Sequence, residues 1–382
     1  MADVSIVRCA SYDADECRAA LEAAIAAVGG LDWVRDGMKI AVKVNLVSAM
    51  RPEEAATVNP VLLTELVKLL HSRGASVVLG DSPGGLYTAA HLNHVYDVTG
   101  LRACEAAGAQ LNQNFAQAHG ENPAARQARH FQYTAWLDDA DAIIDFCKLK
   151  THGQMGMTCA VKNFFGVIPG TMKPEYHYKY PKTEDFSDML VDLYEYFRPR
   201  LCICDAVIGM EGNGPTQGTP RAIGAVLAAG SAHALDLAAA RILGFEPREV
   251  PTLAAAIDRG LCPASADALD ISGALDDFVQ RDVKKTPAQS DAAFYLSGGG
   301  FIAGAVDKML HRILTPFPQL HAAECIHCDK CAGICPAKAI TMTDGLPRID
   351  RRVCIHCFCC QEFCPKGAMR VGRTWIARTL NK

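Results

Sequence analysis

Two runs of cysteine near the C-terminus have the residue type and the spacing to bind metal clusters. Each run reads C-x2-C-x2-C-x3-C-P; the first contains Cys325, Cys328, Cys331 and Cys335, and the second contains Cys354, Cys357, Cys360 and Cys364. This spacing is typical of chains that hold two [4Fe–4S] clusters, where the last cysteine of each run ligates the other cluster. We therefore expect cluster I to take Cys325, Cys328, Cys331 and Cys364, and cluster II to take Cys354, Cys357, Cys360 and Cys335.

The two runs are also an internal repeat, because the second follows the first at an offset of 29 residues. A zinc site is the main alternative, but tetrahedral zinc takes four ligands that usually come as two separated pairs. Cys359 lies inside the second run without breaking its spacing, and we interpret it as a packed neighbour rather than a ligand. The pattern favours a C-terminal domain of the bacterial two-cluster ferredoxin type.

The composition is that of a folded protein with two or three domains. The chain has 382 residues, of which 50% are hydrophobic and 21% are charged, within the range of globular domains. No apolar run follows a basic stretch at the N-terminus, and the apolar segment 223–245 contains His233, Asp236 and Arg241. These features argue against a signal peptide and a membrane span. The 17 cysteines, of which eight lie in the two runs, indicate a reducing compartment, so we expect a cytoplasmic location.

The net charge of −4 is unevenly distributed along the chain. Residues 321–382 carry ten Lys and Arg against five Asp and Glu. Each oxidised four-thiolate cluster adds a charge of about −2, so two clusters offset most of this excess. The C-terminal basic residues are therefore not interpreted as a nucleic-acid patch, and no basic stripe interleaved with aromatic residues supports one.

Residues 1 to about 300 alternate between expected strands and helices. Apolar runs at 39–44, 76–80, 142–147 and 201–205 are typical of short buried strands, and 60–73 has the leucine periodicity of a helix. Such succession predicts the α/β fold class with a mostly parallel, helix-covered sheet. The expected domains are an α/β body at 1–300, a linker helix at 301–320, a small α+β ferredoxin domain at 321–373 and a tail at 374–382.

Polar side chains follow the expected strands, at or just beyond the point where each strand ends. In open α/β sheets, ligands bind beyond the carboxyl ends of the strands. The sequence therefore predicts a polar, mostly cationic pocket at this edge of the body. The candidates, in chain order, are Lys43, Asn45, Asp81, Ser82, Lys148, Lys150, His152, Glu211, Asn213 and Thr216, with Lys162 nearby.

Simpler alternatives exist for these features. Lys148 and Lys150 alternate with Leu149, as on a solvated strand edge, and a lone histidine is more often packed or exposed than catalytic. The glycine-rich segment 211–221 resembles an anion-binding nest, but it lacks the lysine and hydroxyl of a Walker loop. No G-x-G-x-x-G motif opens a helix after the first strand. The sequence therefore contains no specific motif for binding ATP, NAD or flavin. Cys147 and Cys159 could bind a metal with His152, although this spacing is not diagnostic.

The body resembles the domain-of-unknown-function 362 family over roughly residues 4–290. The resemblance is carried by the stretches KVNLV, VVLGDSPG, CKLKTHGQMGMTCAVKNFFGVIPG and DAVIGMEGNGPTQGTPR. Members often carry a C-terminal two-cluster ferredoxin, as this chain does. The resemblance implies an architecture and a set of candidate residues, but no reaction. Those residues are Lys43, Asn45, Asp81, Ser82, Lys148, Lys150, His152, Lys162, Asn163, Glu211, Asn213 and Thr216.

We expect an iron–sulfur oxidoreductase that passes electrons from an external low-potential donor, a ferredoxin or flavodoxin, through two [4Fe–4S] clusters to an anionic small molecule. Lys150, Lys162, His152 and Glu211 are the expected catalytic residues, with His152 as proton donor and Glu211 or Asp81 orienting it or binding a metal. The other candidates would hold the substrate or a further, unidentified cofactor.

Two other functions remain open from the sequence. One is an electron carrier or a subunit of a redox complex without its own catalysis. The other is a cofactor-dependent non-redox enzyme of the isomerase kind, using a metal or a group attached to a lysine. We expect no nucleic-acid or membrane partner, and the oligomeric state is not predicted.

Overall fold

A nine-stranded mixed sheet forms the centre of the body in the computed structural model, which describes residues 1–286 and 315–374. Its order is β11-β1-β10-β9-β7-β2-β3-β4, and β8 pairs with β7 outside this path. The strands are β1 (Val4–Arg8), β2 (Lys39–Val44), β3 (Ser76–Gly80), β4 (Ala109–Leu111), β7 (Ala142–His152), β8 (Gly156–Thr158), β9 (Leu201–Asn213), β10 (Gln217–Ala229) and β11 (Ile271–Ser272). The run β9-β7-β2-β3-β4 is parallel, whereas β10 is antiparallel to both β1 and β9. The predicted α/β class is therefore confirmed.

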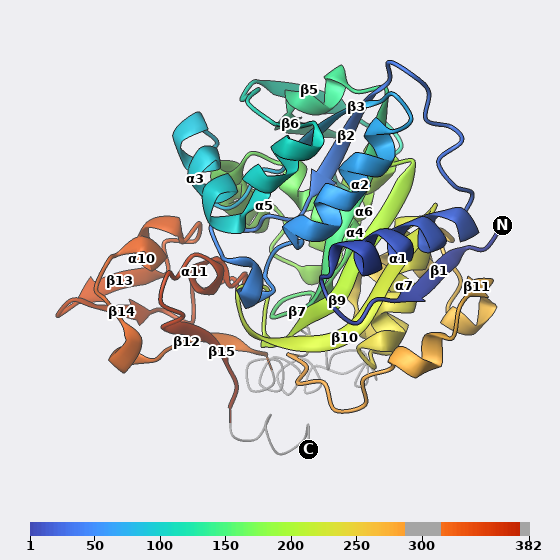
Figure 1. Cartoon of the computed structure of the whole chain (residues 1–382). Coiled ribbons are helices and arrows are strands. Elements are labelled where there is room, and N and C mark those ends of the chain that lie inside the picture. The colour runs from blue at the N-terminus through green and yellow to red at the C-terminus, as the bar shows by residue number, and fades with distance from the viewer. Residues whose placement is uncertain (287–314, 375–382) are drawn as a thin grey trace.

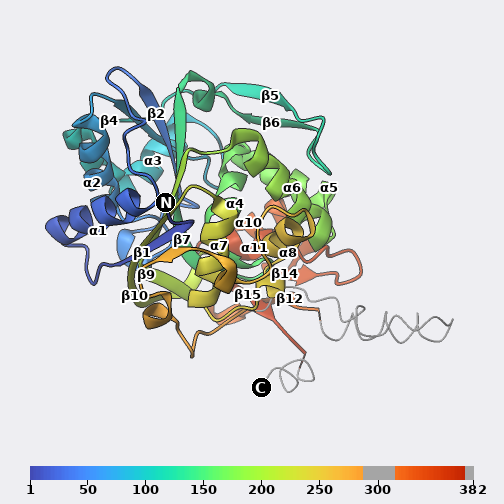
Figure 2. The same cartoon turned by 90° about the vertical axis from the view of Figure 1, so that its right-hand side faces the viewer.

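Helices cover both faces of this sheet (Figure 2). One face packs against α1 (Ala14–Ala27), α2 (Pro60–His71) and α3 (Ala89–Thr99), and the other against α4 (Ala160–Asn163), α6 (Thr183–Phe197), α7 (Ala232–Ile242) and α8 (Pro251–Asp258). The helix α5 (Lys173–Lys179) and the hairpin of β5 (Gln117–Glu121) and β6 (His130–Thr134) complete the body. Two hydrophobic cores result, one on each side of the sheet.

Local sequence explains why these elements form where they do. In β2, the residues Ile40, Val42 and Val44 are all buried in one core, as expected for a strand in a covered parallel sheet. Helix α2 begins after Asn59, whose side chain accepts a hydrogen bond from the Val61 N–H, which is a favourable N-cap. The strands predicted at 39–44 and 76–80 have the observed bounds, and the predicted helix at 60–73 is confirmed as α2.

Two strands run further than the sequence indicates. The strand predicted at 142–147 continues to His152 as β7, and the strand predicted at 201–205 continues to Asn213 as β9. Lys148, Lys150 and His152 therefore lie within a strand rather than beyond its end. The segment 211–221 is the tip of the β9–β10 hairpin, since Asn213 pairs with Gln217, and the nest-like loop considered for it is not formed.

The C-terminal domain packs beside the body at the lower left of Figure 1. It consists of β12 (Phe317–Leu320), α10 (Lys330–Ile334), β13 (Ile340–Thr343), β14 (Leu346–Ile349), α11 (Cys359–Glu362) and β15 (Met369–Gly372). β12 pairs with β15, so residues 317–320 belong to this domain and not to the linker helix expected at 301–320. The remainder of that helix up to residue 314 and the tail from 375 lie outside the described residues.

None of the helices within residues 1–286 and 315–374 combines the length and the apolar character needed to cross a lipid bilayer.

Candidate functional site

A cavity of about 890 Å³ lies between the body and the C-terminal domain. The body lines it with basic side chains from four elements: His91 and His94 on α3, Lys150 and His152 on β7, Lys162 on α4, and Lys173 and His177 on α5. The C-terminal domain closes it with the segment that begins at α11 and contains Glu362, Phe363, Cys364, Pro365 and Lys366. Asn45, Asp81, Ser82, Asn163 and Thr216 also line the cavity, so eight of the predicted site residues meet here.

A chain of buried hydrogen bonds fixes the strand ends beneath the cavity. Lys43 Nζ lies 2.8 Å from an oxygen of Asp81 and 3.2 Å from Asn163 Oδ1. The amide of Asn45 donates to that same Asn163 oxygen at 3.0 Å, and its own oxygen accepts from Lys150 Nζ at 2.8 Å. Lys43 is fully buried and does not line the cavity. Its ion pair with Asp81 therefore acts as support for Asn163, Asn45 and Lys150 rather than as a substrate contact.

Among the described residues, five lysines line the cavity, and three of them, Lys150, Lys162 and Lys173, come from the body. Lys150 is fully buried, and burial together with the charge of Lys148 lowers its pKa to about 7. Burial likewise lowers the pKa of Lys173 to about 7; its ammonium donates to the carbonyls of Ser82 and, at 2.8 Å, Ile168. Burial also lowers the pKa of Lys162. Its Nζ lies over the ring of Phe165, 4.7 Å from the centroid, and has no hydrogen-bonded acceptor among the described residues.

His152 is held in one tautomer by the turn that follows its own strand. Its Nδ1 accepts from the backbone N–H groups of Gln154 and Met155 at 3.1 and 3.2 Å. The ring proton therefore lies on Nε2, which is 3.3 Å from Glu362 Oε1. Burial lowers the pKa of His152, so the ring is neutral near pH 7 and presents a single N–H to the cavity. This state suits a hydrogen-bond donor to a developing negative charge better than the proton donor expected from the sequence.

Glu362 is the acid that meets His152, in place of the expected Glu211 or Asp81. It comes from the end of α11 in the C-terminal domain. Burial opposes its ionisation, but the hydrogen-bonded contact with His152 and the positive charge of Lys162 lower its pKa to about 2. An ionised carboxylate therefore sits among the cationic groups of the cavity. It offsets their mutual repulsion and marks a position that favours an anion.

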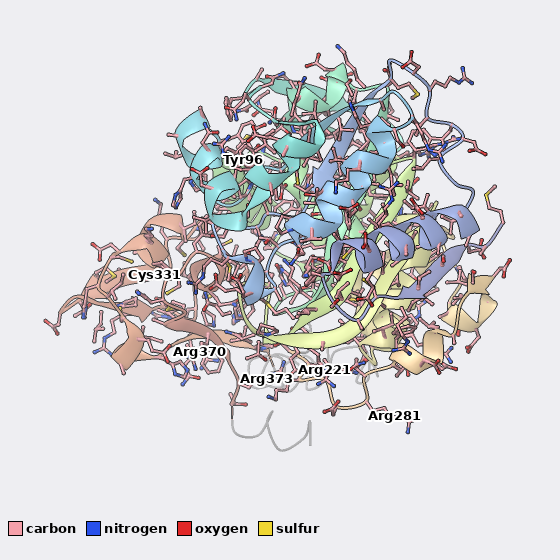
Figure 3. The ribbon with its side chains drawn as sticks, in the orientation of Figure 1. Tyr96, Arg221, Arg281, Cys331, Arg370 and Arg373 are labelled. Atoms are coloured by element: carbon pink, nitrogen blue, oxygen red, sulfur yellow. The ribbon has the colours of Figure 1, made fainter. Side chains whose placement is uncertain are left out.

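The predicted residues Lys148, Glu211 and Asn213 do not line the cavity, and Thr216 lines it where the two domains touch. Lys148 Nζ lies 2.8 Å from both Asp205 Oδ2 and the Tyr12 hydroxyl, and is fully enclosed there. Glu211 pairs with Arg221 at 2.9 Å and with Lys284 at 3.7 Å; Arg221 lies at the lower edge of the body (Figure 3). Asn213 accepts from Gln361 Nε2 and from the Val371 N–H, and Thr216 donates to the Glu362 carbonyl at 3.5 Å. The last two thus join the domains.

The eight cysteines of the two runs cluster in the C-terminal domain, where Figure 3 labels Cys331. The four residues expected for cluster I, Cys325, Cys328, Cys331 and Cys364, line one common cavity. Among the residues expected for cluster II, Cys354 lies near Cys357 and Cys335. Burial raises the pKa of the Cys354 thiol, and these two neighbouring thiols raise it further. Grouped thiol donors of this kind fit an iron–sulfur cofactor. Cys364 also lines the cavity between the domains, so the expected cluster I set borders the Lys and His cluster.

Cys147 and Cys159 do not converge with His152 on a metal position. Their thiols meet Cys204 instead, in the only group of three or more candidate ligands within 4.8 Å of one another that the described residues contain.

Sequence reasoning did not find Lys173, His177 or Glu362. Lys173 and His177 are four residues apart on α5, so they share a helix face, and this spacing was an available signal. His177 is buried against Phe186, with ring centroids 4.3 Å apart, and burial lowers its pKa to about 3. Glu362 had no comparable signal, because its role depends on how the C-terminal domain packs on the body.

The pKa values of Lys150 and Lys173 predict that anion binding weakens as the pH rises. Both pKa values are about 7, so the charged fraction of each ammonium falls about tenfold between pH 6 and pH 8. Sulfate keeps its charge over this range and is a suitable probe. We expect its Kd to rise at least about tenfold from pH 6 to pH 8, measured by calorimetry. Lys150→Arg keeps its charge and is expected to reduce the pH dependence; a Kd that does not change with pH would contradict the assignment.

Comparison with known proteins gives two family matches. The model described as domain of unknown function (DUF362) matches residues 40–241, and a 4Fe-4S dicluster domain matches residues 317–365. The thylakoid-associated protein sll1697 of Synechocystis sp. is 32% identical over 269 residues, which is 69% of this chain and 81% of that protein. The resemblance predicted from the sequence motifs is therefore confirmed.

Two solved structures are also similar to this chain. The lactate racemase apoprotein from Thermoanaerobacterium thermosaccharolyticum has a TM-score of 0.39 at 12% identity, covering 62% of this chain and 56% of that one. A structural-genomics target from Thermotoga maritima has a TM-score of 0.34 at 12% identity, covering 56% of this chain and 55% of that one. The chain thus spans little more than half the length of each.

Proposed function

Because the chain belongs to the DUF362 family and carries a 4Fe-4S dicluster domain, we propose that it is an iron–sulfur oxidoreductase that reduces an anionic small molecule between its two domains. The observation that carries this proposal is the composition of the cavity. One wall holds Lys150, His152 and Lys162, and the other contains Cys364, an expected cluster ligand. A docking platform without catalysis would not need buried lysines and a tautomer-fixed histidine beside a cluster ligand.

The expected cofactors are two [4Fe–4S] clusters, held by the two sets of four cysteines given above. When bound, such clusters supply single electrons at low potential. The external donor would be a ferredoxin or a flavodoxin. We propose a cytoplasmic location, because the 17 cysteines, eight of them in the two ligand runs, indicate a reducing compartment.

The body residues have separate roles in this proposal. Lys162 and Lys173 hold the anionic group of the substrate, since their ammonium groups border the cavity. Lys150, with a pKa of about 7, supplies a proton near neutral pH, where an acid of matched pKa is most effective. His152 donates its Nε2–H to the oxygen or nitrogen on which negative charge develops. Glu362 keeps that N–H oriented until the substrate replaces it or binds beside it.

The test is substrate-dependent re-oxidation of the reduced protein without oxygen. The full-length protein is reduced with dithionite, freed of excess reductant, and mixed with a panel of carboxylated and phosphorylated small molecules. Return of the visible absorbance is then recorded. We expect one chemical class to re-oxidise the wild-type protein, and Lys162→Met to slow this at limiting substrate. If no small anion is active and a protein partner co-purifies in stoichiometric amount, the chain is an electron carrier instead.

A further inference from the structure

Three thiols meet inside the body, in a place that the cavity and the two cysteine runs do not include. Cys147 on β7 and Cys204 on β9 are opposite one another in the sheet register, and Cys159 is the residue before α4. The Sγ of Cys159 lies 3.4 Å from that of Cys147 and 3.5 Å from that of Cys204. All three Sγ atoms lie within 4.8 Å of one another, and the three residues are at most 1% exposed.

The spacing of these sulfurs is that of a shared metal ion. Thiolate sulfurs bind zinc at about 2.3 Å, which places neighbouring sulfurs about 3.8 Å apart around a tetrahedral ion. The observed separations of 3.4 Å and 3.5 Å are slightly shorter than this value, and the three sulfurs all lie within 4.8 Å of one another. Little rearrangement is therefore needed for one ion to contact all three sulfurs.

Two buried acids lie beside the thiols, and one of them has an oxygen without a hydrogen-bond partner among the described residues. Asp145 lies two residues before Cys147, and therefore on the same face of β7. One of its oxygens accepts from Asn163, but Oδ2 is buried with no hydrogen-bond partner among the described residues. Asp236 on α7 is 1% exposed and accepts from the N–H groups of Ala160 and Val161, the two residues after Cys159. Ordinary core cysteines pack singly as small apolar groups, whereas here three thiols meet beside a buried oxygen that has no partner among the described residues.

We propose that Cys147, Cys159 and Cys204 bind one thiophilic d10 metal ion, Zn²⁺ or Cu⁺. Soft thiolate ligands select these ions, and the metal would replace the three thiol protons. The ion would join β7, β9 and the start of α4. Because β7 carries Lys150 and His152 and α4 carries Lys162 and Asn163, the metal would fix two walls of the cavity relative to one another. Neither the ion nor this role depends on the reaction proposed above.

The test uses the full-length protein, produced with zinc and copper in the medium and purified without oxygen. Elemental analysis is expected to find about one zinc or copper per chain beyond a full iron and sulfide content, and the element found identifies the ion. X-ray absorption at the edge of that element is expected to show sulfur neighbours at about 2.3 Å. A protein with full iron content and no zinc or copper would overturn the proposal, even if every variant failed to fold.

Cys202 provides a matched control for Cys204. It lies two residues earlier on β9, is equally buried, and contacts the Tyr194 hydroxyl at 3.5 Å rather than the three thiols. We expect Cys204→Ser to lose the extra metal and keep its iron, and Cys202→Ser to keep both. Retention of the metal by Cys204→Ser would place the ion elsewhere and overturn the proposal.

Discussion

Replacing His152 with alanine is expected to lower turnover by about a hundredfold or more while the iron–sulfur centres stay reducible by dithionite. Loss of one preorganised donor to a developing negative charge costs about 10² to 10³ in rate. The Nε2–H of His152 is such a donor, because two backbone N–H groups occupy Nδ1 and leave only this proton facing the cavity. The measurement is the rate of re-oxidation of the reduced protein at saturating substrate.

A second buried histidine–glutamate pair serves as the control. His233 Nε2 lies 3.0 Å from Glu195 Oε1 and is 2% exposed, as His152 is, but His233 does not line the cavity. His233→Ala therefore removes a comparable buried pair and is expected to leave turnover near the wild-type value. Equal rates in the wild type and His152→Ala would remove His152 from the mechanism, whereas equal losses in both variants would indicate a general effect on folding.

Replacing Cys360 with alanine is expected to lower the iron content from about eight to about four per chain or fewer, because a cluster lacking one of its thiolates is not held. The neighbouring Cys359 is the matched control. Both residues lie on α11 and are buried, with exposures of 6% and 2%, but only Cys360 has the ligand spacing. Cys359→Ala is expected to keep about eight iron atoms. Iron and acid-labile sulfide assays measure both.

The same pair of variants distinguishes the ligand assignment from its alternatives. Loss of iron in Cys359→Ala with retention in Cys360→Ala would reverse the roles of the two residues. If the cysteine runs bound zinc instead of iron–sulfur clusters, both variants would contain no iron. An equal loss in both variants would indicate that α11 itself is needed for the domain to fold.

The sequence by itself determined those features of this protein that arise from residues close together along the chain. Three of the four ligands of each cluster lie within seven consecutive positions, so the cluster pattern is visible without a fold. The strands β2 and β3 were predicted with their observed bounds because short apolar runs bounded by turn residues are local signals. Lys150 and His152 were predicted from their residue types at the end of such a run, and Lys162 from its nearness to them and the family resemblance; all three line the cavity.

Only the tertiary structure decided which candidate charges share the cavity. Lys148 and Lys150 are two residues apart, yet the register between β7 and β9 shifts between them. Lys148 pairs with Asp205, while Lys150 contacts Asn45 and lines the cavity. Glu211 likewise pairs with Arg221 on the neighbouring strand. Ion pairs of this kind depend on contacts across strands, and the spacing of residues along one strand does not contain them.

The position of Glu362 also could not be predicted from the sequence, because it depends on how the two domains pack. It is 210 positions from His152 along the chain, yet the two side chains are 3.3 Å apart. Packing of α11 against the body brings them together, through contacts such as Gln361 with Asn213 and Thr216 with Glu362. The residue types at the site were thus readable from the sequence. The ionised acid that completes it comes from a second domain, whose docking is set by surface contacts distributed over the whole interface.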